Sequence, residues 1–328
     1  MPAAKVSDAE FVELWNAKKG SLRAVAETLG MAQRATAYRR RAVEKNLRVT
    51  LKAGAQRPDV AAKFEPYSPR QHKAFHQLGI ENGTIVVFSD AHFWPGIRST
   101  AFRALLKLIE DLKPKAVICN GDAFDGASIS RHPRIGWDSV PSVQEELRAC
   151  KYALGEIEDA AGKAKLVWPL GNHDARFESR LAAVSPQFEG VKGFHLKDHF
   201  PAWIPCWAAL VGEGLVIKHR YKGGIHATHN NAVWSGRSIV TGHLHSLKVT
   251  PFSDYNGTRW GVDTGMLADK PSFDGQGPQF ADYLEGGPVN WRSGFAVLTM
   301  HKGELLWPEL VHVRTKGVAE FRGSIFEV

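Results

Sequence analysis

Between residues 84 and 246 the chain repeatedly places Asp, Asn or His directly after a short apolar segment. The first segment reads IVVFSDAHF, so that Asp90 and His92 follow a predicted strand. Side chains alternate along an extended chain, and these two would therefore point the same way. Four more segments, KAVICNGDAFD, AKLVWPLGNHD, GLVIKHR and RSIVTGHLH, end in the same residue types. The full set is Asp90, His92, Asn120, Asp122, Asp125, Asn172, His173, Asp174, His219, His243 and His245.

Amphipathic segments alternate with these predicted strands. STAFRALLKLIEDLK, which stops before Pro114, and PSVQEELRACKYALGEIEDAAG both have apolar residues at helical spacing. Strand–helix alternation predicts an α/β fold with its chemistry at the carboxyl ends of the strands. We therefore expect the polar residues that follow the five strands to gather in one place.

A gathering of carboxylate and imidazole groups predicts a metal site. One such pair alone is more often an ordinary surface pair, but five sets at five strand ends are difficult to explain separately. Carboxylate and imidazole ligands suit Mn, Fe, Zn or Ni. The three cysteines, Cys119, Cys150 and Cys206, are widely spaced, so that neither a closed cysteine zinc site nor a disulfide framework is expected.

The ordered motifs D-x-H, G-D-x-x-D, G-N-H-D, H and G-H-x-H resemble those of the calcineurin-like metallophosphoesterase superfamily, over about residues 84–246. The resemblance implies two β-sheets packed face to face with helices outside, and two divalent cations on loops at the strand ends. It also implies a ligand set: Asp90, His92 and His245 for one cation, Asn172, His219 and His243 for the second, and Asp122 as the bridge. His173 would stand over the site, with its ring held by Asp174.

Those residue types suit phosphoester hydrolysis on physical grounds. Two cations about 3.5–4 Å apart need an anionic bridge such as Asp122, and they acidify a shared water and neutralise charge on the phosphoryl oxygens. His173 would protonate the leaving oxygen. Asp125 is expected to hydrogen-bond a ligand histidine. We expect Mn²⁺, with Fe, Zn and Ni as alternatives.

Three positions depart from the family pattern. The Ser/Thr protein phosphatases of the superfamily carry Arg after GDxxD and Glu after GNH, where this chain has Gly126 and Asp174. This departure disfavours a protein phosphatase. His219 is not followed by the usual Gly, so that His226 and His229 stay open as substitutes for that ligand.

The segment GASISRHPRIGWDSVP, directly after Asp125, is long and irregular. It would overhang the metal site, where Arg131, His132 and Arg134 are candidates to bind a second phosphate of the substrate. A surface loop with solvated arginines is an equal alternative.

The excess positive charge lies at the N-terminal end of the chain. Residues 1–80 contain 15 Lys and Arg against 7 Asp and Glu, which leaves 27 of each for the rest. Such asymmetry points to an anionic partner, most often nucleic acid. A soluble region that is merely rich in Lys and Arg would give the same numbers.

Three helices are expected within residues 1–50, with Ser7 and Ser21 as caps. Ala26, four residues before Gly30, permits a close helix crossing, and the spacing over residues 21–45 resembles helix-turn-helix modules. The third helix would then offer polar side chains to DNA. The candidates are Gln33, Arg34, Arg39, Arg40 and Arg41. A plain three-helix bundle used for protein contacts is the alternative.

Together these features predict an all-α, helix-turn-helix-like domain in 1–50, a linker in 51–82 and an α/β metallophosphoesterase domain, a two-sheet β-sandwich flanked by helices, in 83–328. The expected activity is dimetal hydrolysis of DNA phosphodiesters. The combination is similar to phage-encoded phosphoesterases, so that we expect a cytoplasmic protein, in the host cytoplasm if phage-encoded. The alternatives are a phosphatase or small-nucleotide phosphodiesterase, and a non-catalytic DNA-binding regulator. Neither a secretory signal nor a membrane span is expected.

Overall fold

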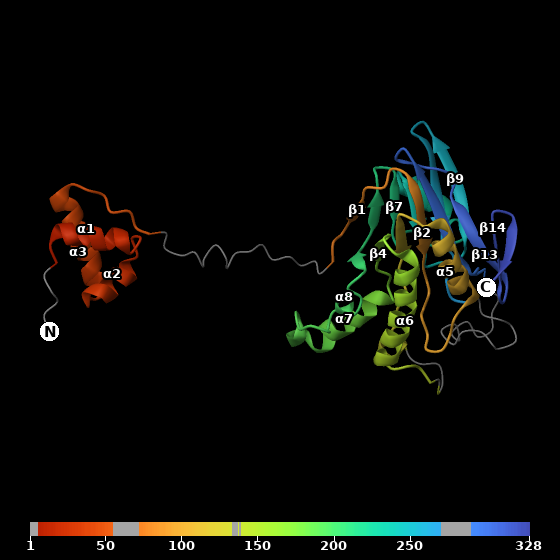
Figure 1. The fold of residues 1–328 in the computed structure, drawn as a ribbon, viewed down its shortest axis with the longest axis horizontal. Helices are drawn as coiled ribbons and strands as arrows, with labels where there is room; N and C mark the ends of the chain where they lie inside the picture. The colour runs from red at the N-terminus through yellow and green to blue at the C-terminus, as the bar shows by residue number, and fades with distance from the viewer. Residues whose placement is uncertain (1–5, 55–71, 133–136, 138, 270–289) are drawn as a thin grey trace. The chain divides into compact units, whose positions relative to one another are not determined.

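The pattern of the sequence changes near residue 80, and the structure divides the chain close to that change. The computed structural model describes residues 6–54, 72–132, 137, 139–269 and 290–328. It separates a first unit, residues 1–69, from a second unit, residues 70–328 (Figure 1). The first unit is helical, and the second is built from β-sheets with helices outside.

Three helices form the first unit: α1 (Asp8–Ala17), α2 (Leu22–Leu29) and α3 (Gln33–Leu47). Ser7 and Glu10 cap α1 reciprocally, and Ser21 caps α2. Gly30 ends α2 in a left-handed conformation (φ 62°) that glycine adopts without strain. The helices expected from the sequence are therefore present, and a helix-turn-helix role for them stays a prediction.

The first unit extends beyond its predicted end at residue 50. Its core consists of Phe11, Trp15, Val25, Val43 and Leu51. The indole N–H of Trp15 donates to the carbonyl of Lys52 (2.8 Å). The predicted boundary is therefore too early, because the segment after α3 returns to cover the core.

Two β-sheets form the second unit. One has the strand order β15-β14-β13-β11-β2-β3-β4-β5, with β12 paired to β11, and the other has the order β1-β6-β7-β8-β10-β9. The strands are β1 (His76–Leu78), β2 (Gly83–Phe88), β3 (Ala116–Cys119), β4 (Lys165–Pro169), β5 (Ile204–Cys206), β6 (Ala209–Val211), β7 (Leu215–Ile217), β8 (Ser238–Thr241), β9 (Lys248–Asp254), β10 (Gly257–Asp263), β11 (Gly294–His301), β12 (Glu304–Leu305), β13 (Glu309–Thr315), β14 (Val318–Phe321) and β15 (Ser324–Glu327). The helices are α5 (Thr100–Leu112), α6 (Val143–Ala161), α7 (Asp174–Val184), α8 (Leu196–His199) and α9 (Ala227–Ser235), with short 3₁₀ turns η1 (Ala127–Ile129) and η2 (Pro186–Phe188).

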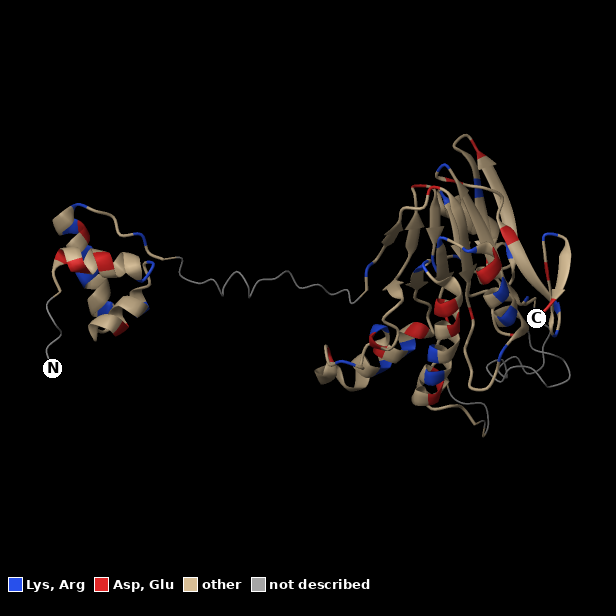
Figure 2. Ribbon diagram, in the orientation of Figure 1, with Lys and Arg blue, Asp and Glu red and all other residues tan. Residues whose placement is uncertain are grey.

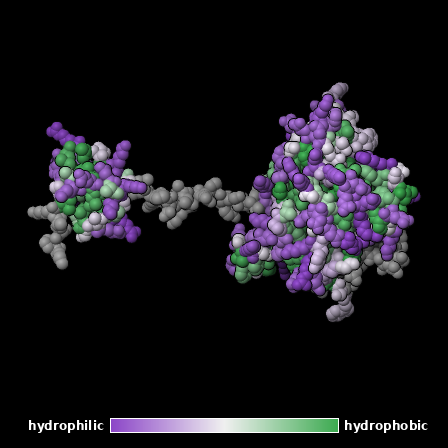
Figure 3. Space-filling model, viewed as in Figure 1, coloured by the Kyte–Doolittle hydropathy of each residue, from purple (hydrophilic) through white to green (hydrophobic). Residues whose placement is uncertain are grey.

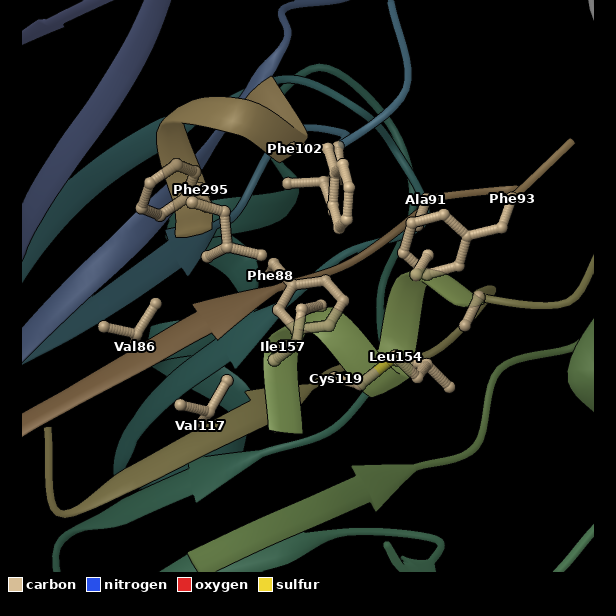
Figure 4. Close-up of a cluster of buried hydrophobic side chains, with 14 of the residues drawn as sticks. Val86, Phe88, Ala91, Phe93, Phe102, Val117, Cys119, Leu154, Ile157 and Phe295 are labelled. Atoms are coloured by element: carbon tan, nitrogen blue, oxygen red, sulfur yellow. The ribbon is translucent and has the colours of Figure 1, made fainter. Parts of the chain in front are cut away.

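Strand β2 shows how the sandwich is held together. Ile85 and Val87 point into a core shared by both sheets, whereas Val86 and Phe88 point into a core under α5 and α6 (Figure 4). Both faces of β2 are buried, which explains its continuous apolar sequence. The predicted α/β architecture, two sheets face to face with helices outside, is confirmed. The surface that faces the viewer in Figure 3 is mostly hydrophilic, as this inward sorting requires.

Parallel pairing places the predicted site loops together. In the larger sheet β2, β3, β4 and β5 are parallel neighbours, and in the smaller sheet β7 is parallel to β8. All motif loops leave the carboxyl ends of these strands. The predicted site residues therefore lie together at one end of the sandwich.

The predicted linker, residues 51–82, is too long at its C-terminal end. His76–Leu78 forms β1 and pairs in parallel with β6, and His72 is buried. The pairing is with a strand more than a hundred residues later, which no local pattern announces. Over the described residues, no helix is long and apolar enough to cross a membrane.

The two-faced burial of β2 gives a stability prediction. Phe88→Ala removes a fully buried ring and is expected to lower the free energy of unfolding of the second unit by about 3–5 kcal/mol. Urea denaturation of the full chain measures this change. Phe75→Ala is the matched control, because Phe75 is 62% exposed, and it should change the value by less than about 0.5 kcal/mol. Equal effects at both positions would contradict the assignment of the core.

Candidate metal centre

The loops after five strands meet at one end of the sandwich. Asp90 and His92 follow β2, Asp122 follows β3, Asn172 follows β4, His219 follows β7, and His243 and His245 follow β8. Backbone hydrogen bonds tie these loops together, from His92 to the carbonyl of Asp122 (3.0 Å) and from Gly242 to that of His219 (2.9 Å). The predicted convergence of residues from both sheets is therefore present in the structure.

The predicted ligands form two groups. Ligand atoms of Asp90, His92 and His245 all lie within 4.8 Å of one another, and so do those of Asp122, His219 and His243. In the first group His245 Nε2 is 3.1 Å from Asp90 Oδ1, and in the second His219 Nε2 is 3.0 Å from Asp122 Oδ2. The first group is the set that the motif resemblance implies for one cation, and the second joins two of the ligands implied for the other cation, His219 and His243, to the implied bridge Asp122.

Three of the predicted ligands leave a buried polar atom without a hydrogen-bond partner, namely Asn172 Oδ1, His219 Nε2 and His245 Nδ1. Buried polar atoms are rarely unpaired, because each loses its hydration without replacement. The His219 nitrogen faces a carboxylate oxygen at 3.0 Å but has no hydrogen-bonding geometry to it. Oxygen and nitrogen atoms of this kind, without a partner among the described residues, are donors that divalent cations bind.

Two of the predicted ligand histidines, His219 and His92, make a hydrogen bond through Nδ1 to a group on the side of the ring away from the site. His219 Nδ1 lies 2.8 Å from the carbonyl oxygen of Asn120, which requires Nδ1 to be the donor. His92 Nδ1 lies 2.8 Å from Asp125 Oδ1. Each bond directs the Nε2 lone pair of its ring toward the site, as outer partners do for metal-bound histidines. Asp125 thus occupies the place expected for it behind a ligand histidine.

The backbone at the site is strained. Five of the seven predicted ligands have positive φ: Asp90 (52°), His92 (41°), Asp122 (54°), His243 (71°) and His245 (57°). Residues other than glycine rarely adopt this left-handed region, and each instance costs about 1–3 kcal/mol. Such strain concentrates at functional sites. Here it turns successive side chains inward from short loops.

Two motif glycines are required by close approach. A Cβ atom on Gly171, in the GNHD motif, would lie 2.0 Å from Asp122 Oδ1. A Cβ atom on Gly242, in the GHLH motif, would lie 2.5 Å from Asp90 Oδ2. Both distances are far inside contact, so that only glycine lets the backbone pass beside the two carboxylates.

Charges in the site support one another. Burial alone would raise the pKa of Asp90. The positive charges of His245 and His219 outweigh this effect and lower the pKa to about 2. Burial likewise opposes ionisation of Asp122, yet His219 and His173 hold its pKa well below the usual range. In turn burial lowers the pKa of His219, and Asp122 and Asp90 overcome this and raise it to about 10. Both carboxylates are therefore ionised and ready to bind cations near neutral pH.

The predicted contact between Asp174 and the ring of His173 is wrong. The Asp174 carboxylate accepts hydrogen bonds of 2.8–3.1 Å from four backbone N–H groups, those of Asp122, Ala123, Phe124 and Gly171. It accepts a fifth, of 3.0 Å, from the indole N–H of Trp168. The ring of His173 is held by Asp125 instead, with Nδ1 2.7 Å from Oδ1. Asp174 opens α7 and is fully buried below the loops, so that backbone donors reach it first.

His173 stands at the edge of the site with its Nε2 3.9 Å from Asp122 Oδ2. Burial lowers the pKa of His173, but Asp122 and Asp125 raise it above the ordinary value, against a weaker opposing effect of Arg176. Arg176 was not predicted. Its guanidinium lies 3.2 Å from His173 Nε2 and donates to the carbonyl of Asp125 (3.0 Å). Its position three residues after His173 at a helix start was the available signal.

The histidines that were left open as substitutes lie elsewhere. His226 precedes α9, and His229 packs edge-on against Phe252, with ring centroids 5.6 Å apart. His219 is the histidine beside Asp122. Arg131 and His132 are exposed on the loop after η1, and no described contact brings them to the ligands. Arg134 lies outside the described residues.

The DNA-contact candidates on α3 separate into two sets. Arg39 pairs with Asp8 (2.6 Å) and Arg40 with Glu44 (3.1 Å), and their guanidinium groups lie over the rings of Phe11 and Trp15. These two arginines are half-buried over the unit's own core, and their contact with DNA stays a prediction. The exposed candidates are Gln33, Arg34 and Arg41. Figure 2 shows Lys and Arg together with Asp and Glu on the helices of this unit, and both signs of charge over the second.

Comparisons with known proteins agree with this geometry. The family model for calcineurin-like phosphoesterases matches residues 83–260, more than half of the chain and all seven predicted ligands. The Gene 54 protein of Mycobacterium phage L5 is 27% identical over 262 residues, which cover 74% of this chain and 98% of that protein. The Gene 54 protein of Mycobacterium phage D29 is 26% identical over 276 residues, with the same coverage of 74% and 98%.

Solved structures give a further comparison. A structure described as a novel archaeal phosphodiesterase is 15% identical, with a TM-score of 0.35, over 70% of this chain and 99% of that one. Zinc-bound wild-type Vps29 from Entamoeba histolytica is 12% identical, with a TM-score of 0.36, over 74% and 96%. On the match of its ordered motifs and of more than half its length, the chain belongs to the calcineurin-like phosphoesterase family, a class of metal-dependent hydrolases that act on phosphoesters.

Proposed function

We propose that this protein is a phosphodiesterase that uses two divalent cations to cleave DNA, to which its N-terminal unit binds. The observation that carries the proposal is the pair of three-residue ligand groups at one end of the sandwich, where buried atoms of Asn172, His219 and His245 have no hydrogen-bond partner among the described residues. A separate, basic helical unit in the same chain supports nucleic acid as the substrate. The relatives of the chain reported above are phage proteins, which supports action in the cytoplasm of a host cell.

Seven side chains would hold the cations. Asp90, His92 and His245 would bind one, Asn172, His219 and His243 the other, and Asp122 both. Cations in such a site polarise the phosphoryl group and lower the pKa of water to near neutrality. The set of nitrogen and oxygen donors without thiolate favours Mn²⁺, with Fe, Zn and Ni as alternatives.

His173 would protonate the leaving oxygen. Asp125 holds its Nδ1, and Nε2 lies 3.9 Å from Asp122 Oδ2 and 3.2 Å from the guanidinium of Arg176, which would have to turn away when Nε2 carries a proton. Asp122 and Asp125 raise the pKa of His173 above its ordinary value against the effect of burial, which favours the protonated ring that a general acid needs. Asp174 would act only through the backbone, because it holds the loop that carries Asp122 and lies against the chain at Gly171.

DNA would bind along one face of α3. Arg34, Tyr38, Arg41 and Lys45 follow the spacing i, i+4, i+7, i+11, which aligns them on one side of a helix. All four are exposed, and Tyr38 is 58% exposed. The positively charged side chains on this face can contact DNA phosphates, and the aromatic ring among them can stack on a base. Tyr38 and Lys45 were missed by sequence analysis, which counted arginines rather than helical positions.

A second candidate function is a phosphatase or a small-nucleotide phosphodiesterase, with the N-terminal unit used for protein contacts. Arg39 and Arg40 form ion pairs within the N-terminal unit, so that fewer arginines are available for DNA, and this favours the second function. A non-catalytic regulator is disfavoured, because none of the seven ligand positions carries an apolar residue. Assays with Mn²⁺ on single-stranded and duplex DNA and on small phosphomonoesters separate these functions. Rapid turnover of monoesters without DNA cleavage would overturn the proposal.

Asp122→Asn tests the bridging carboxylate. The change is expected to lower kcat at least about 10²-fold, because the charge that binds both cations is lost. Elemental analysis should show fewer than the roughly two metal ions per chain that such a dimetal site holds when intact. Asp159→Asn, on the exposed side of α6, is the control and should change neither value. Full activity in Asp122→Asn would contradict a bridging role.

His173→Ala tests the proton donor. Turnover should fall by about 10²–10⁴-fold for esters with poor leaving groups and much less for p-nitrophenyl esters, which need no protonation. Metal content should be unchanged, because His173 is not among the proposed ligands. A loss of the same size for every leaving group would remove the acid role.

The double change Arg34→Gln and Arg41→Gln tests the DNA-binding face. It should weaken DNA binding and reduce the slope of log affinity against log salt by about 2, since each phosphate contact contributes about 0.9. Arg23→Gln on α2 is the control, because Arg23 already pairs with Glu27. Hydrolysis of a small chromogenic ester should be unaffected in both variants. An unchanged salt slope in the double variant would show that this face does not contact DNA.

A further inference from the structure

A groove of about 700 Å³ lies beside the candidate metal centre and has no role in the function proposed so far. One wall is the loop before α9 and its first turn, with Ile225 and Thr228. The other wall consists of residues 290–292, and Lys248 at the start of β9 lies between them. This volume is within the range of pockets that hold small organic ligands.

The groove is joined directly to the ligand loop of β8. Leu244, which lies between His243 and His245 in sequence, forms part of its lining. The ring of Trp291 meets the ring of His245 edge-on, with centroids 4.4 Å apart, and the backbone N–H of Arg292 donates to the carbonyl of His245 (2.8 Å). The groove is therefore close enough to the metal centre to hold a group that is attached to a phosphate bound there.

The lining selects for an anion. Lys248 and Arg292 are both exposed there, and the described residues that line the groove include no Asp or Glu. Within the described part of the chain these two side chains bond only to neutral groups, Lys248 Nζ to the carbonyl of Ile225 (3.4 Å) and Arg292 to the side chain of Asn290 (2.7 Å). Both can therefore turn toward a bound phosphate.

The remaining lining selects for a flat, partly apolar group with polar edges. Trp291 offers an indole surface, and Ile225, which is 77% exposed, offers an aliphatic one. Ser246 and Asn290 add hydroxyl and amide groups. An aromatic wall with hydrogen-bonding edges and nearby cations is the combination that binds nucleotides.

We infer that this groove binds the nucleoside and flanking phosphate next to the scissile phosphodiester, with the base against Trp291 and Ile225. The inference rests on the proposed function and deepens it, because it specifies nucleotide esters over simple phosphate esters. It also separates substrate choice from the metal centre. Binding in the groove sets KM for nucleotide substrates, whereas the ligand loops set the rate of hydrolysis.

The test compares two esters that release the same leaving group. Thymidine 5′-(p-nitrophenyl phosphate) and methyl p-nitrophenyl phosphate differ only in the group opposite p-nitrophenolate, and kcat and KM are measured for both with Mn²⁺ on the full chain. Ile225→Glu places a negative charge in the groove at an exposed position, and Ile325→Glu, at a position 63% exposed on β15, is the matched control. Trp291→Ala removes the stacking surface, and Trp291→Phe restores part of it.

Ile225→Glu and Trp291→Ala are each expected to raise KM for the thymidine ester about tenfold, the scale of one lost base contact. The value of kcat/KM for methyl p-nitrophenyl phosphate should change by less than about twofold, because its methyl group is too small to reach into the groove. Trp291→Phe should recover most of the loss with unchanged metal content, which a structural defect at His245 would not allow. Ile325→Glu should match the unsubstituted protein.

Equal losses for both esters, or no loss for either, would overturn the groove inference while the proposed function stands. If the unsubstituted protein cleaves neither ester nor DNA, the proposed function fails. The groove is then judged by calorimetric titration with thymidine 3′,5′-bisphosphate, which needs no hydrolysis. Binding that Ile225→Glu weakens about tenfold would support the inference, and absent or unaltered binding would overturn it.

Discussion

Two buried carboxylates determine how one end of the sandwich is built. Asp90 and Asp122 are almost completely buried, and removing a charge from water costs several kcal/mol unless polar groups replace the water. The backbone N–H groups of His243 and His173 donate to them at 2.9 and 2.8 Å, and imidazoles lie beside them. Loops from both sheets must bend tightly to bring these donors close. The left-handed backbone at Asp90 and Asp122 and the obligatory glycines beside them follow from that requirement.

Much of the fold could be predicted because it depends on local patterns. Strands such as β2 are buried on both faces and therefore read as continuous apolar runs, and α5 and α6 show helical spacing between them. Parallel strands between helices bring their ends together whatever the details of packing. The two ligand groups follow from that topology and from the motif order, and the structure brings those same residues together.

The remainder depends on contacts that no local pattern specifies. Asp174 could equally have turned to a histidine or to backbone donors, and the choice depends on how the loops after β3 and β4 pack. Arg39 and Arg40 were interpreted by charge alone, but aromatic rings of the unit's own core lie under them. Trp291 reaches His245 from 46 positions later in the chain. Its approach depends on the pairing of β11 beside β2 in the larger sheet.

The five N–H groups that converge on Asp174 have a consequence for how the protein exchanges its ions. One anionic side chain below the surface fixes the loops after β3 and β4 through their main chains, without using any group that faces the cations. The loops after β3 and β4 therefore reach their final positions during folding rather than when the metal ions bind. Ions can enter and leave a scaffold that already has its final shape, so that depletion and reconstitution should be reversible without passage through an unfolded chain.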